Sequence, residues 1–323
     1  MATVANNARR SIGKAGDYIS PAALMAIKSL ELRARTIVEG FCNGLHRSPY
    51  HGFSVEFTEY RQYTPGDDLR YMDWRLYART DRYYVKRFED ETNLRCHLLV
   101  DSSKSMGFGS LEYTKSDYAK TLAATLAYFL STQRDAAGLI RFDDSIDDYI
   151  PARYRTGHLR RIMVALEKPE TGNATNVAQP LDQVAEMVTK RGMLVLLSDL
   201  LADISELDKR LGYLRARGHE VVVFHTLDPA EISLDFDQPS LFEDAESGRQ
   251  LYVDPLAARQ TYQRNLQAHI EHVQISCEKH GITYHRLVTD TPMEDALLNY
   301  LQDRLHTSPQ PVRRTGNQGG RVT

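Results

Sequence analysis

The sequence predicts an α/β fold built on a mostly parallel sheet, and three observations support this prediction. From residue 94 onward, short apolar runs alternate with amphipathic helical stretches, which is typical of strands joined by helices. The runs 193–197 and 221–224 are apolar at successive positions, as strands covered on both faces must be. The run 94–101 ends in an aspartate followed by polar residues. We therefore expect helices on both faces of the sheet and a ligand site at its carboxyl edge.

The residues before this region predict one helix and a small β-rich segment. Ser20 and Pro21 are typical of a helix cap and a first helical position, and apolar residues then recur at helical spacing up to about Gly44. Alternating residues over 54–57 and 83–88 predict short strands.

The α/β region can be divided by the same alternation. The expected strands are 94–101, 138–142, 148–150, 193–197, 221–224 and 282–285, the expected helices are 113–133, 157–167, 177–190, 204–217, 255–279 and 292–305, and 241–243 with 250–253 form a hairpin. The chain then divides into a flexible N-terminus, a helical and β-rich segment, the α/β domain and a disordered tail rich in proline, glycine and polar residues. These parts span 1–20, 21–92, 93–305 and 306–323.

Composition and charge argue against several classes of protein. A net charge of −3 over 323 residues gives no overall attraction for nucleic acid or an anionic membrane. The cysteines Cys42, Cys96 and Cys277 are far apart and match no disulfide or metal pattern, which indicates a reducing compartment. No apolar run approaches the length of a membrane span. We therefore expect a cytoplasmic protein without a direct membrane span and without a nucleic-acid partner.

Five oxygen-bearing side chains predict a divalent-cation site. Asp101, Ser103 and Ser105 form a DxSxS motif after one strand, Asp199 follows another strand, and Thr175 lies in a polar loop. This set suits Mg²⁺, with Mn²⁺ or Ca²⁺ as alternatives. Because hydroxyls are neutral ligands, we expect the set to leave the ion underneutralised, which favours a carboxylate supplied by a partner protein. The pattern therefore indicates an adhesion-type site, with no catalytic residue and no site for an organic cofactor.

These residues resemble the metal-ion-dependent adhesion site of von Willebrand factor A domains. The resemblance covers roughly 94–305 and implies a von Willebrand factor A-like, Rossmann-like fold. The sequence departs from the usual Gly-Gly-Thr loop, because Ala174 precedes Thr175.

A second resemblance lies in the block before the domain. Residues 56–80 read EFTEYRQYTPGDDLRYMDWRLYART and residues 85–91 read VKRFEDE, which is similar to the signature of the bacterial domain of unknown function 58 family. Members of that family are commonly associated with MoxR-type AAA+ ATPases, so the resemblance implies a similar partner. The charged and aromatic side chains of the block have two open interpretations, a small β unit fixed by ion pairs and a docking surface.

The function that we expect from the sequence is a non-catalytic, metal-dependent protein-interaction module. It would act as an adaptor or co-chaperone of the ATPase through an Mg²⁺-bound partner carboxylate. One alternative is a metal-dependent phosphate-ester hydrolase that uses Asp101, with Lys190 and Asp199 as later partners. The hydrolases of this kind need a second carboxylate two residues after the nucleophile, where this chain has Ser103. Two further alternatives are a scaffold with a vestigial metal site and a plain polar turn.

Overall fold

The computed structural model describes residues 19–47, 60–62, 84–86, 94–169, 178–236, 238–244 and 248–307. The strands are β1 (Tyr60–Gln62), β2 (Tyr84–Lys86), β3 (Arg95–Asp101), β4 (Ala136–Phe142), β5 (Ile146–Arg153), β6 (Met193–Ser198), β7 (Glu220–Leu227), β8 (Ser240–Glu243), β9 (Gln250–Val253) and β10 (Thr283–Val288). The helices are α1 (Pro21–Met25), α2 (Leu30–Arg47), the 3-10 helix η2 (Lys104–Gly107), α4 (Lys115–Thr132), α5 (His158–Leu166), α6 (Ala178–Met187), α7 (Ile204–Ala216), α8 (Pro229–Ser233), α9 (Pro255–Lys279) and α10 (Met293–Thr307).

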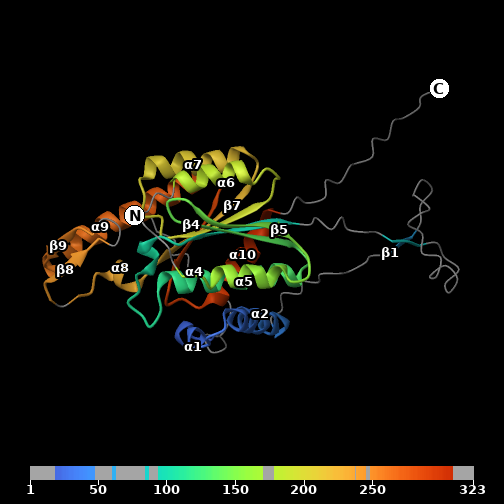
Figure 1. The fold of residues 1–323 in the computed structure, drawn as a ribbon, viewed down its shortest axis with the longest axis horizontal. Helices are drawn as coiled ribbons and strands as arrows, with labels where there is room; N and C mark the ends of the chain where they lie inside the picture. Colours follow the sequence, from blue (N-terminus) through green and yellow to red (C-terminus); the bar gives the residue numbers. More distant parts are fainter. Residues whose placement is uncertain are drawn as a thin grey trace, which may run out of the picture.

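A six-stranded sheet forms the centre of the molecule (Figure 1). Its strand order is β10-β7-β6-β3-β4-β5, and every neighbouring pair is parallel except β4 and β5. The predicted α/β, von Willebrand factor A-like fold is confirmed. Because β3 and β6 are parallel neighbours, with Val100 beside Leu197, their carboxyl ends meet at one edge of the sheet.

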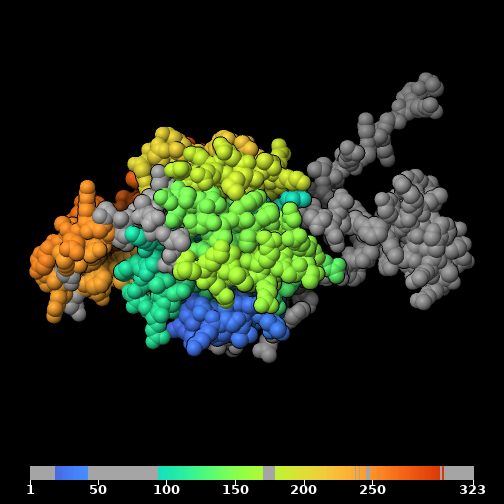
Figure 2. All heavy atoms as spheres, in the orientation of Figure 1, coloured from blue at the N-terminus to red at the C-terminus, as the bar shows by residue number. Residues whose placement is uncertain are grey.

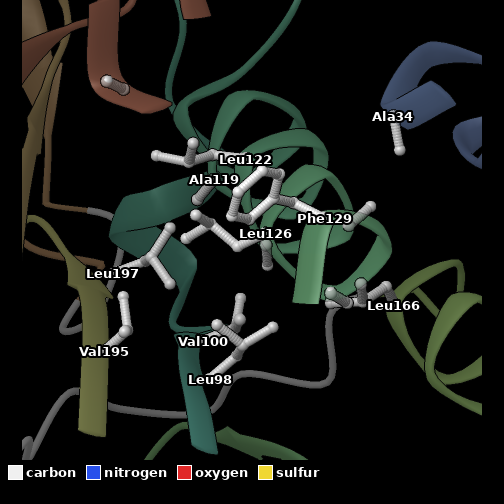
Figure 3. Packing of buried hydrophobic residues seen from close by; sticks show 14 of the residues in the cluster. Ala34, Leu98, Val100, Ala119, Leu122, Leu126, Phe129, Leu166, Val195 and Leu197 are labelled. Atoms are coloured by element: carbon white, nitrogen blue, oxygen red, sulfur yellow. The ribbon is translucent and has the colours of Figure 1, made fainter. Parts of the chain in front are cut away.

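Two hydrophobic cores cover the two faces of this sheet, because successive side chains of a strand point to opposite faces. Leu98 and Val100 of β3 face α4, α5 and α10, whereas Leu99 between them faces α6, α7 and α9. Figure 3 shows the first core, in which Leu98 and Val100 lie beneath Leu126 of α4. The expected cover of helices on both faces is therefore confirmed.

The N-terminal part packs on the first core, but it holds two helices where the sequence predicted one. Residues 26–29 separate α1 from α2, and the Ser29 hydroxyl accepts a hydrogen bond from the Leu32 amide at the start of α2. The Arg33 side chain donates to the Ile27 carbonyl at 2.5 Å, so this carbonyl has a partner outside the helical pattern. Helix α2 lies against the body of the molecule, as Figure 2 shows in blue.

The ends of the chain and the β-rich segment are described only in part. Strands β1 and β2 pair antiparallel, whereas the expected strand 54–57, the N-terminal residues 1–18 and most of the expected tail lie outside the described residues. Helix α10 extends to Thr307, two residues beyond its expected end at 305. The division of the chain at residue 93 stays a prediction. None of the helices in the described ranges is both long enough and apolar enough to cross a membrane.

Candidate metal centre

The DxSxS motif begins on the last residue of the buried central strand. Asp101 ends β3, and the Ser102 amide extends the ladder by donating to the Phe142 carbonyl at 2.7 Å. The chain then turns at Ser103, which precedes η2. Asp101, Ser102 and Ser103 are fully buried. The sheet therefore fixes the position of the aspartate, and the turn into η2 carries the two hydroxyls of the motif.

Both carboxylate oxygens of Asp101 accept hydrogen bonds. The Ser103 amide donates to Oδ1 at 2.9 Å, and the Ser198 hydroxyl at the end of β6 donates to Oδ2 at 2.5 Å. Burial raises the pKa of Asp101 to about 7, and the charge of Asp199 adds to this increase, while the bonds from Ser198 and Ser103 oppose it. A buried carboxylate with a raised pKa gains from a nearby cation.

The two hydroxyls of the motif lie together beside this carboxylate. Ser103 Oγ and Ser105 Oγ are 3.1 Å apart. Two ligands at right angles around Mg²⁺, each about 2.0 to 2.1 Å from the ion, lie about 2.9 Å apart. The spacing of the two oxygens therefore fits adjacent positions in an octahedral shell.

Asp199 lies next to this group, and its carboxylate is paired with a lysine. Lys115 Nζ lies 2.8 Å from Asp199 Oδ2 and 2.5 Å from Glu231 Oε1, and the side chains of Lys115 and Asp199 have no exposed surface. Burial lowers the pKa of Lys115, but the charges of Asp199 and Glu231 outweigh burial and raise it overall. The ammonium is therefore charged at neutral pH.

The structure brings together four of the five residues that the sequence predicted for the site. Asp101, Ser103 and Ser105 form one hydrogen-bonded group, and the charge of Asp199 acts on Asp101. Thr175 lies outside the described residues. Within the described ranges, no cluster of three or more His, Cys, Asp or Glu side chains could hold a metal, so the candidate site depends on its hydroxyl ligands.

Sequence reasoning missed Lys115 and Glu231 and assigned no role to the Ser198 hydroxyl. Lys115 is the first residue of α4, where a cation opposes the positive end of the helix dipole. That placement was the available signal, because it implies a carboxylate partner elsewhere in the chain.

The lysine named in the hydrolase alternative lies at the wrong end of the sheet. Lys190 precedes β6 and lines a groove with Arg95 and Arg153, whereas Asp199 follows β6. Six residues of extended strand separate the two ends by about 20 Å. Lys190 therefore cannot act together with Asp199.

The sheet order and the position of DxSxS define a von Willebrand factor A-like protein with a candidate cation site. Residues 59–272 match the model of the family described as protein of unknown function DUF58, and the chain belongs to this family.

Relatives and solved structures with which the chain can be compared are as follows. An uncharacterized protein of Mycobacterium tuberculosis and one of Mycobacterium bovis are each 31% identical over 259 residues, or 79% of this chain and 81% of theirs. A conserved hypothetical protein, BatB, from Bacteroides thetaiotaomicron has a TM-score of 0.46 at 12% identity, covering 66% of this chain and 100% of that one. An aerotolerance-related membrane protein from Bacteroides fragilis has a TM-score of 0.45 at 13% identity, covering 66% and 99%. The SpRpn10 VWA domain has a TM-score of 0.37 at 12% identity, covering 64% and 95%.

Proposed function

We propose that this protein is a non-catalytic, divalent-cation-dependent protein-interaction module. Asp101, Ser103 and Ser105 would bind Mg²⁺ directly, Asp199 would act mainly through water, and Thr175 would complete the set of protein ligands. The ion would retain a position for a carboxylate of the partner protein. Mn²⁺ and Ca²⁺ are the alternative ions.

The observation that carries this proposal is the 3.1 Å spacing of the Ser103 and Ser105 hydroxyls beside the buried Asp101 carboxylate. With Asp101 as the one charged direct ligand and neutral hydroxyls beside it, the protein ligands that touch the ion compensate only part of its charge, and the remainder attracts an anionic group. Carboxylates are hard oxygen ligands that suit this class of ion. The site thus supports metal-dependent contact with an acidic side chain.

The partner that we propose is a MoxR-type AAA+ ATPase, for which this protein would serve as an adaptor or co-chaperone. The chain belongs to the DUF58 family, and the support for this partner is that members of the family are commonly associated with ATPases of this class. The cytoplasm is the compartment that we propose for the complex.

The test measures the affinity of this protein for the purified, nucleotide-free ATPase. Parallel samples contain either Mn²⁺ or a chelator. Omitting nucleotide removes the metal requirement of the ATPase itself. We expect binding with Mn²⁺ that is lost with chelator and lost in Asp101→Ala. The matched control is Ser102→Ala, because the Ser102 hydroxyl lies within hydrogen-bond distance of the Phe142 carbonyl and the Asp147 carboxylate and is not a proposed ligand.

Two results would count against the module. Equal binding by wild type and Asp101→Ala would show that the ion site is not used for this contact. Unchanged, metal-independent binding by Ser103→Ala would favour the alternative of a scaffold with a vestigial site.

A further inference from the structure

Lys115 is a buried cation held by carboxylates from two other elements. It begins α4, and its side chain reaches Asp199 after β6 and Glu231 on α8. Burying an ammonium costs on the order of several kcal/mol of lost hydration, and the position of this ammonium at a helix N-terminus adds to that cost. Only close carboxylates offset such costs, so the position of Lys115 depends on Asp199 and Glu231.

The charged side chains around the candidate ion site follow one another in a row, from Asp101 through Asp199 to Lys115. Asp101 ends β3 and Asp199 directly follows the parallel neighbour β6, so these two buried carboxylates lie at the same edge of the sheet and repel each other when both are ionised. In the described part of the chain, Lys115 is the ion-pair partner of Asp199. His225 lies near Asp199 as well, but it is fully buried and its Nδ1 contacts the Tyr284 hydroxyl at 2.8 Å. Lys115 therefore supplies the positive charge beside Asp199.

Glu231 neutralises Lys115 from the other side. One Glu231 oxygen accepts from Lys115 Nζ, and the other accepts from the Asp228 amide at 2.9 Å in the capping box of α8. The Asp228 carboxylate accepts from Ser110 and Ala230, which are neutral donors. Glu231 is thus the group that balances the lysine on the side away from Asp199.

Building on the proposed function, we propose that Lys115 is the resident counter-cation of the ion site and sets its affinity for the divalent ion. With no ion bound, the ammonium neutralises Asp199 and limits its repulsion of Asp101. With the ion bound, the same ammonium repels it and engages one Asp199 oxygen. Lys115 therefore preserves the shape of the empty site and weakens binding of the ion.

Two substitutions should change the affinity in opposite directions. Lys115→Met removes the repelling charge and leaves Asp199 unpaired, so the Kd for Mn²⁺ should fall by more than about tenfold. Glu231→Gln removes the charge that balances Lys115, so the Kd should rise by about threefold or more. Lys120→Met is the matched control on α4, because Lys120 reaches the Lys168 carbonyl and is not part of the site; its Kd should equal that of wild type.

The experiment is a calorimetric titration of the full chain with Mn²⁺ at pH 8, with Asp101→Ala included. Suppose that wild type binds Mn²⁺ and that this binding requires Asp101. If Lys115→Met then binds Mn²⁺ no more tightly than wild type does, the counter-cation role of Lys115 is refuted and the proposed function stands. If neither wild type nor Lys115→Met binds the ion, both are wrong. If Lys115→Met fails to fold, Glu231→Gln decides: weaker binding supports the counter-cation, and equal or tighter binding overturns it.

Discussion

The Ser198 hydroxyl donates a 2.5 Å hydrogen bond to Oδ2 of Asp101 and so joins the ends of the neighbouring strands β6 and β3. The same hydroxyl oxygen accepts from the Leu200 amide at 3.0 Å. Ser198 thus satisfies one buried carboxylate oxygen and one buried amide, and it orients Asp101 before any ion binds.

Replacing Ser198 with alanine should destabilise the protein, because both partners would lose a hydrogen bond inside the protein. The free energy of unfolding in chelator should fall by about 1 to 3 kcal/mol, the usual cost of an unsatisfied buried polar group. Urea denaturation would measure this change. Ser205→Ala is the control, because it also removes a hydroxyl that donates to a carboxylate, that of Asp203, but at an exposed position on α7 where water can replace the bond. It should change stability by no more than about 0.5 kcal/mol; an equal loss in both variants would refute the role of Ser198.

Binding of Mg²⁺ should strengthen as the pH rises through neutrality. In the metal-free protein the pKa of Asp101 is raised from 3.8 to about 7, mainly by burial. The folded state therefore retains a proton that the unfolded state loses, and between these two values the contribution of Asp101 to stability falls as pH rises. Because the ion must displace this proton, its affinity should increase about tenfold per pH unit below pH 7.

The measurement for this prediction is thermal unfolding from pH 5.5 to 8.5, with and without Mg²⁺. The increase in Tm caused by Mg²⁺ should grow with pH and level off above about pH 7.5. In Asp101→Asn it should be absent throughout. An increase that is the same at pH 5.5 and pH 8 would contradict the assignment of Asp101.

A second pH dependence, unrelated to the ion, should arise where α7 meets α9. Hydrogen bonds from Lys279 and Ser276 lower the pKa of Asp208 from 3.8 to about 2, against the effect of burial, and His280 also donates. The stability gained from Asp208 is thus complete above pH 3.8 and is lost as pH falls toward 2. Asp208→Asn should reduce the free energy of unfolding at pH 7. The reduction should be only about 1 kcal/mol, because the ion pair of Asp208 and Lys279 is partly exposed and solvent screens it.

Guanidinium denaturation of Asp208→Asn and wild type at pH 7 and pH 2 would check this prediction. The difference between the two proteins should nearly vanish at pH 2. A constant difference at both pH values would mean that the charge of Asp208 does not contribute.

The hydrolase alternative predicts turnover of a generic phosphate ester with Mg²⁺, and we expect none. The residue two positions after Asp101 is Ser103, which lacks a carboxylate to transfer a proton, and Lys190 lies at the other end of β6. Release of p-nitrophenol from its phosphate ester would be followed with wild type and Asp101→Ala. Turnover that disappears in the variant would establish the enzyme.

The parts of the structure that the sequence could predict were those with a local signal. Strands β3 and β6 were identifiable because their apolar runs are contiguous, and the DxSxS motif because its three proposed ligands span only five residues. The break between α1 and α2 had no such signal, since the apolar spacing continues through Ile27. Lys115 and Glu231 are separated by 116 positions, so only the folded sheet shows that they meet.

The most direct test of the cation site is a calorimetric titration of the full chain with Mg²⁺ at pH 8, comparing wild type with Asp101→Ala and Ser103→Ala. Asp101→Ala removes a charged ligand and should abolish measurable binding. Ser103→Ala removes one neutral ligand and should weaken binding by about tenfold, or about 1.4 kcal/mol. Binding of Mg²⁺ to Asp101→Ala with the affinity of wild type would contradict the central claim that this aspartate holds the ion.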